Sequence, residues 1–151
     1  MPNWVSNEFY VEAEKSTKSR KQLKDFIKDS VIEKDDKDYT GKPIKTYHLS
    51  FEGIVPMPKT EKDNWYNWRC ENWGTKWDAC DSDIYDEDSD YICINFNTAW
   101  SPPTFWMLAA TKKYPLLDFS NKVDEEGNFF AGWVLAKKGR VQENLATPNW
   151  R

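Results

Sequence analysis

Segments with strand periodicity alternate with segments of helical periodicity along this chain, and that order limits the folds open to it. Residues 4–11 (WVSNEFYV) place Val5 and Phe9 on one face of an extended strand. Leu23 and Phe26 then recur at helical spacing within a lysine-rich segment, which predicts an amphipathic helix whose lysines face water. The chain therefore begins with a strand followed by a helix.

Further strands and a second long helix follow. The strands are expected at residues 47–55 and 91–96, and in the arms of a hairpin, 116–123 and 129–136, that turns at Glu126-Gly127-Asn128. The sequence Ser101-Pro102-Pro103 predicts the helix start, because serine caps helices and proline suits the first helical position. That helix is expected to run to about Tyr114 and to bury Phe105, Leu108 and Ala109.

A shorter helix, expected at residues 63–73, is inserted before the third strand. The order β-α-β-(inserted helix)-β-α-β-β favours an α+β fold with the ferredoxin-like split βαβ sheet, helices on one face and a Trp-rich helical insert. A length of 151 residues suits one domain. We expect this domain over residues 1–137 with the insert at 56–90, followed by a polar C-terminal tail at 138–151.

Composition indicates a globular protein without a metal site. Hydrophobic residues make up 39% and charged residues 30% of the chain, and no apolar run approaches the roughly 20 residues that span a bilayer. The N-terminus lacks the pattern of a secretory signal, so we expect a cytoplasmic location. Cys70, Cys80 and Cys93 are odd in number and widely spaced, and His48 is the single histidine. Reduced thiols, and no metal or cofactor, are therefore expected.

Charge is unevenly distributed along the chain, whose net charge is −4. Residues 15–28 hold six bases and one acid, whereas residues 78–90 hold seven acids and no base. We expect the basic segment to be a solvated helix face and the acidic segment to be a mobile loop. The acidic segment does not fit an EF-hand calcium loop, because Tyr91 stands where that loop requires glycine.

Several short motifs resemble those of a known family. They are MPNWVSN (1–7), IVPMP (54–58), WY (65–66), ENWGTKWDA (71–79), TAWSPP (98–103) and FAG (130–132). Together they resemble the YubB ferredoxin-like domain family of bacteriophages and conjugative plasmids. The resemblance implies a ferredoxin-like fold and a mobile-element origin, and it implies no catalytic mechanism.

Four of the nine tryptophans fall within residues 65–77. One interpretation is that these rings seal the insert onto the sheet, since aromatic side chains bury large areas. The other is that they line a ligand site, where flat rings stack on nucleobases and basic side chains hold phosphates. The residues expected at such a site are Trp65, Trp68, Arg69, Asn72, Trp73, Lys76, Trp77 and Asp78, together with Trp100 and Ser101 at a helix N-terminus.

Catalytic motifs are absent from the sequence: it has no Gly-rich phosphate loop and no GxSxG elbow, and one histidine excludes a two-histidine hydrolase. The sequence therefore favours a binding protein over an enzyme. The first hypothesis is a phage or plasmid accessory protein that sequesters a host nucleotide, such as an immune-signalling one, or a short single-stranded nucleic acid, or that inhibits a host defence factor. The alternatives are a protein–protein inhibitor acting through the acidic loop and basic helix, and a nucleotide- or RNA-processing enzyme. An exposed sheet edge is also compatible with a homo-oligomer.

Overall fold

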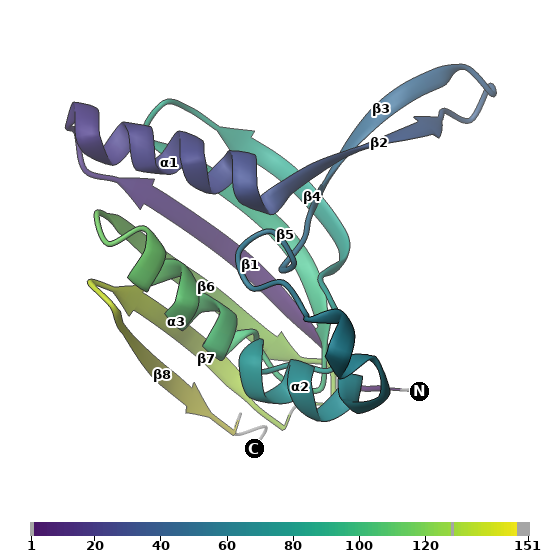
Figure 1. The fold of residues 1–151 in the computed structure, drawn as a ribbon, viewed down its shortest axis with the longest axis vertical. Helices are drawn as coiled ribbons and strands as arrows, with labels where there is room; N and C mark the ends of the chain where they lie inside the picture. The colour runs from purple at the N-terminus through teal and green to yellow at the C-terminus, as the bar shows by residue number, and fades with distance from the viewer. Residues whose placement is uncertain (1, 128, 148–151) are drawn as a thin grey trace.

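The computed structural model describes residues 2–127 and 129–147 and contains a six-stranded antiparallel sheet with helices on one face (Figure 1). The strands of the sheet are β1 (Trp4–Ala13), β4 (Cys80–Glu87), β5 (Tyr91–Ala99), β6 (Leu117–Glu125), β7 (Ala131–Lys137) and β8 (Arg140–Ala146). A separate hairpin is made by β2 (Val31–Lys37) and β3 (Pro43–Leu49). The helices are α1 (Thr17–Ser30), α2 (Trp65–Asn72), α3 (Thr104–Lys113) and the short 3-10 helix η1 (Lys59–Asn64).

The strand order β4-β5-β1-β6-β7-β8 contains two interleaved split βαβ units. The unit β5-α3-β6 has β1 between its strands, and the unit from β1 through α1 to β4 has β5 between its strands. Both α1 and α3 lie on the same face of the sheet (Figure 1). The predicted α+β, ferredoxin-like fold is therefore confirmed, and β7 and β8 extend the sheet beyond β6.

Helix α1 forms as its sequence predicts. Ser16 caps it: its hydroxyl accepts the backbone N–H of Ser19 at 3.1 Å. Leu23 and Phe26 are buried against the sheet, while the basic residues of the segment point away from it. Phe26 packs with Phe9 of β1 in an aromatic core, so the first strand and the first helix share one apolar interface.

The acidic segment forms strand β4, so the prediction of a mobile loop there was wrong. The strand pairs with β5 through Asp83 opposite Asn95 and Ile84 opposite Ile94. Ile84 packs against the core, while the acids of the strand remain at the solvated edge of the sheet. Pairing with β5 and the packing of Ile84 therefore hold this edge strand, while its carboxylates stay in water.

The strand predicted at residues 47–55 ends earlier, at Leu49. The carboxylate of Asp78 accepts the backbone N–H of Phe51 at 2.7 Å, which satisfies that donor outside a strand ladder. The chain then turns, and Phe51 enters the core with its ring 4.8 Å from that of Trp106. The alternation of apolar residues predicted correctly that Phe51 is buried. Its prediction of a strand at Phe51 was wrong.

Helix α3 begins at Thr104 and presents a different face from the one predicted. Its buried apolar residues are Trp106, Met107 and Ala110, whereas Phe105 is 48% exposed. The predicted cap is not made, because the Ser101 hydroxyl donates instead to the carbonyl of Gly74 at 2.5 Å. The helix consequently starts later in the sequence than the Ser-Pro-Pro motif indicates.

The segment expected to be a C-terminal tail contains strand β8. It pairs with β7 with Val134 opposite Glu143, and Val141 and Leu145 pack against the core. The sheet thus continues past residue 137, while residues 148–151 of the expected tail lie outside the described residues. Asn128 of the expected hairpin turn also lies outside them.

Candidate functional site

A groove of about 530 Å³ lies beside the tryptophan-rich helix, and we call it the indole groove. Its lining residues are Met57, Lys62, Asp63, Trp65, Arg69 and Trp77. Lys62, Trp65 and Arg69 are spaced three and four residues apart through η1 and α2, so consecutive helical turns bring them to one side. Two cations and one carboxylate line the groove, which gives it a positive balance.

Arg69 is held between two indole rings. Its guanidinium carbon lies 5.1 Å from the ring centroid of Trp65 and 5.3 Å from that of Trp73. Its Nε is buried without a hydrogen-bond partner, and no carboxylate forms an ion pair with it in the part of the chain that the structure describes. The rings fix the guanidinium through cation–π contacts, and its charge is left for an external anion.

Trp77 also lines the groove, and Lys76, an expected site residue that does not line it, lies over the Trp77 ring. The ammonium of Lys76 lies 4.6 Å from the ring centroid of Trp77 and 5.8 Å from that of Tyr66. Trp4 of β1 packs against Trp77 with centroids 5.9 Å apart and a 44° tilt. Trp77 is half-buried, so one part of its ring anchors it while another part reaches the groove.

The remaining expected site residues of the insert are structural. Trp73 is fully buried, and its indole N–H donates to the carbonyl of Val55 at 2.9 Å. Trp68 packs edge-on against Trp73 at 5.6 Å and contacts the core. The Asn72 side chain donates to the carbonyl of Trp68 at 2.8 Å, within the same helix. Trp68 and Trp73 therefore anchor the insert, and Trp65 and Trp77 line the groove. That the groove is a ligand site stays a prediction.

Asp78 fastens the insert to the turn after β3. Its two carboxylate oxygens accept from the Ser50 hydroxyl at 2.8 Å and from the backbone N–H of Phe51 at 2.7 Å. A carboxylate occupied in this way has little capacity left for a ligand. Asp78 is also absent from the lining of the indole groove. We therefore assign it a structural role.

Trp100 and Ser101 do not join the indole groove. Trp100 is 49% exposed, with a positive φ of 71°, and it does not line the groove. Close to the start of α3, the backbone N–H of Trp106 donates to the carbonyl of Trp73 at 3.1 Å. The insert itself packs on the start of this helix, so the anion site expected at its N-terminus is not formed there.

Several residues of the groove were missed in the sequence. Met57, Lys62 and Asp63 line the groove and precede the predicted site in the sequence. Trp4 does not line the groove, but it packs against the lining residue Trp77 from a distant part of the sequence. The spacing of Lys62 three residues before Trp65 and seven before Arg69 could have revealed the lysine, had the helical register been extended backwards. The Trp4–Trp77 contact depends on tertiary structure and has no local signal.

Two of the three thiols are poor nucleophiles, and the described part of the chain contains no metal cluster. Burial raises the pKa of the Cys80 and Cys93 thiols, and a thiol held in its protonated form is a weak nucleophile. No group of three or more His, Cys, Asp or Glu side chains suited to a metal ion occurs among residues 2–127 and 129–147. Over the same residues, no helix has the length and apolar character needed to span a membrane.

The sheet order and the helices on one face define a ferredoxin-like domain. The sequence profile described as "Ferredoxin-like domain in Api92-like protein" matches residues 72–147, just over half of the chain. The chain belongs to this family. The match runs from the end of α2 through β8, so it covers the β5-α3-β6 unit and the two added strands β7 and β8.

A solved structure of the protein Api92 from Yersinia pseudotuberculosis resembles the chain, with a TM-score of 0.53 and 13% identity. The similarity covers 69% of this chain and 43% of that one, so the chain corresponds to less than half of that protein. At this identity the likeness shows the fold alone. The comparison with curated proteins finds no match.

Proposed function

We propose that this protein is a non-catalytic binding domain that holds a nucleotide in the indole groove. The observation that carries the proposal is Arg69, a cation fixed between two indole rings without a carboxylate partner in the described residues. A guanidinium of this kind suits a phosphate, which it can bind through two parallel hydrogen bonds. Trp65 and Trp77 line the same groove, so a base can stack on the part of either ring that Arg69 or Lys76 does not cover.

The dimensions of the groove favour a single nucleotide over a long nucleic acid strand. Its volume of about 530 Å³ lies within the usual range of small-molecule sites, roughly 300–1,000 Å³. The open face of the sheet, which carries nucleic acid in some folds of this shape, exposes Glu8, Glu12 and Asp124. These carboxylates would repel a phosphate backbone.

The biological role that we propose follows from the resemblance to YubB proteins. An accessory protein of a phage or plasmid would sequester a host nucleotide, for example one used in immune signalling, without converting it. Sequestration needs a tight site and no catalytic group, which agrees with a groove that contains cations and rings but no activated nucleophile.

Calorimetry of the intact protein against linear and cyclic mono- and dinucleotides tests this proposal. We expect Trp77→Ala to weaken the binding of the best nucleotide by about 1–3 kcal/mol, the usual contribution of a base–aromatic stack. The matched control is Trp133→Ala, because Trp133 is 45% exposed on β7 and lies outside the groove. Arg69→Gln should weaken the binding of nucleotides and leave the binding of the corresponding nucleosides unchanged.

Three results would contradict the proposal. The first is that no nucleotide binds more tightly than about 1 mM. The second is that the two tryptophan variants bind the nucleotide equally well, and the third is that chromatography recovers the bound nucleotide as a reaction product. The last result would indicate an enzyme. Thermal unfolding of each variant separates a lost contact from a lost fold.

A further inference from the structure

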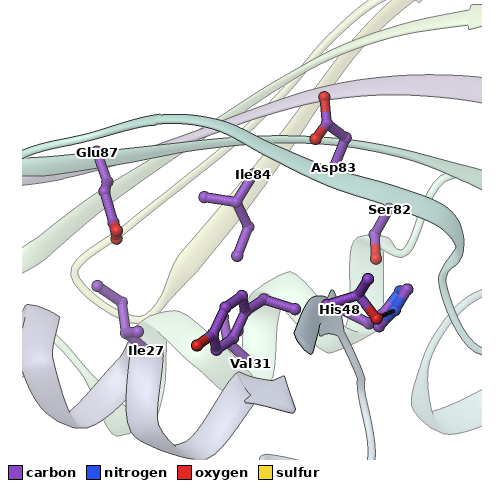
Figure 2. A pocket seen from close by; sticks show the side chains of 9 residues that line it. Ile27, Val31, His48, Ser82, Asp83, Ile84 and Glu87 are labelled. Carbon is purple, nitrogen blue, oxygen red and sulfur yellow. Dashed lines mark hydrogen bonds between the residues drawn. The ribbon is translucent and has the colours of Figure 1, made fainter. Parts of the chain in front are cut away.

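A second, larger groove lies between the hairpin and the main sheet, and we call it the edge groove. It has a volume of about 660 Å³ and is lined by residues of α1, β2, β3 and β4. In Figure 2, the side chains of Ile84 and Glu87 point from β4 toward Ile27 and Val31 below them, and Ser82 points toward His48. The edge groove therefore has an apolar floor and a carboxylate beside it.

Two strand edges border the edge groove. Within the described residues, β4 pairs with β5 alone and β3 pairs with β2 alone, so each has an edge without a strand partner. The strands meet at the base of the groove, where the backbone N–H of Leu49 donates to the hydroxyl of Ser82 at 3.0 Å. An edge with free backbone donors and acceptors is a template for an added strand.

The charge of β4 restricts what such a strand can be. Residues 80–87 contain four acids and no base, and none of the four forms an ion pair among the described residues. A second copy of β4 would bring acid against acid, and a nucleic acid would be repelled in the same way. Side chains of an added strand alternate between its two faces, so an apolar side chain beside Ile84 places the flanking basic ones on the opposite face. Asp83 points to that face (Figure 2), so its carboxylate is complementary to basic side chains there.

The regular part of the edge is short. Register shifts occur between Cys80 and Asp83 and between Ile84 and Asp86. Bulges and charges of this kind protect an edge from indiscriminate pairing. They still leave a stretch around Ile84 where a short segment can form main-chain hydrogen bonds.

We propose that the edge groove binds an extended segment of a partner protein, which adds a short strand to β4 and carries an apolar side chain flanked by basic ones. Main-chain hydrogen bonds supply affinity, the apolar side chain enters between α1 and β4, and the basic side chains pair with the acids of β4. The residues of the edge groove differ from those of the indole groove, so this proposal is tested independently of nucleotide binding.

A synthetic peptide of alternating lysine and valine, about six residues long as strands commonly are, is a suitable probe. Binding to the intact protein is measured by fluorescence anisotropy, and the site is mapped from backbone amide shifts in NMR spectra. We expect shifts in β4 and β3, and at least about tenfold tighter binding than a glutamate–valine peptide of the same length. A peptide N-methylated along one edge should bind at least about tenfold more weakly, because it lacks the donors of a strand.

Asp83→Lys should weaken the binding of the lysine–valine peptide by about tenfold or more, and Trp77→Ala should leave that binding unchanged. Glu126→Lys is the matched control, because Glu126 is exposed and lies outside the edge groove. Equal effects of the two lysine variants would show attraction by net charge alone and would overturn the proposal. Equal binding of the N-methylated peptide, or no peptide bound more tightly than about 1 mM, would also overturn it.

Discussion

Gly53 lies in the turn after β3, directly against the C-terminal turn of α1. A Cβ placed on Gly53 would lie 1.5 Å from the carbonyl oxygen of Asp29 and 2.7 Å from the carbonyl carbon. The nearest atoms belong to the backbone, so a side chain cannot be accommodated by a change of rotamer. The turn and the helix must separate instead, and the core beneath them contains Phe26 and Phe51.

We therefore expect Gly53→Ala to destabilise the protein by about 1–3 kcal/mol, the usual penalty of overpacking. Chemical denaturation followed by tryptophan fluorescence measures this change. Gly41→Asn is the control, because Gly41 has open space around it and asparagine tolerates its φ of 85°. An unchanged denaturation midpoint for Gly53→Ala would show that α1 and the turn are not in close contact.

Only some residues of the indole groove could be predicted from the sequence. Trp65 and Arg69 are four residues apart on one helix, so their proximity follows from local geometry. Trp73 was expected at the same site as Trp65, but α2 ends at Asn72 and Trp73 is buried in the core. Where a short helix ends depends on its packing, which the spacing of residues does not reveal.

Elements with a strong local pattern were predictable from the sequence, and elements stabilised by their neighbours were not. The alternation in β1 and the capped, amphipathic α1 each bury one face, and both were predicted. Strand β4 has few apolar residues and many acids, so its composition indicates a loop. Its strand conformation comes from pairing with β5, an interaction between segments that no local pattern encodes.

Strand β8 was also missed, because its sequence is largely polar. It nevertheless places Val141 and Leu145 against the core, because residues four positions apart lie on the same face of a strand. We expect Leu145→Ala to destabilise the protein by about 1–2 kcal/mol, less than for a fully buried leucine because Leu145 is half-buried. Gln142→Ala, at an exposed position of the same strand, should change the stability by less than about 0.5 kcal/mol.

Thermal unfolding of these two variants decides whether β8 is part of the cooperative fold. If Leu145→Ala is as stable as Gln142→Ala, then the C-terminal segment is a loose tail, as its composition indicates. A clear difference would place β8 with the rest of the sheet, in agreement with its pairing to β7.

At the scale of the whole molecule, the two grooves have opposite charge. The indole groove is lined by two cations and one acid, whereas the edge groove is lined by two acids, Asp83 and Glu87, and no lysine or arginine. In Figure 1, α2 and the β2–β3 hairpin lie at different ends of the molecule. One ferredoxin-like sheet can thus present an anion site and a cation-preferring site without mutual interference.

The hairpin projects from the sheet (Figure 1), and its outer residues are exposed to solvent. Lys34 and Thr46 face each other in its register, so residues 35–45 can be replaced by an Asn-Gly turn that joins them. No buried core residue and no lining residue of either groove lies in the removed segment. We therefore expect the melting temperature to stay within about 2 °C of the original value.

The shortened protein should also retain its affinity for nucleotides and for the lysine–valine peptide within about threefold, close to the error of such comparisons. A fall in melting temperature well beyond that range would mean that the outer hairpin stabilises the main sheet. Loss of peptide binding at an unchanged melting temperature would instead place part of the partner site on the outer hairpin, beyond Thr46. Because the outer hairpin contributes no buried residue to the core, the shortened variant separates a role of this segment in stability from a role in binding.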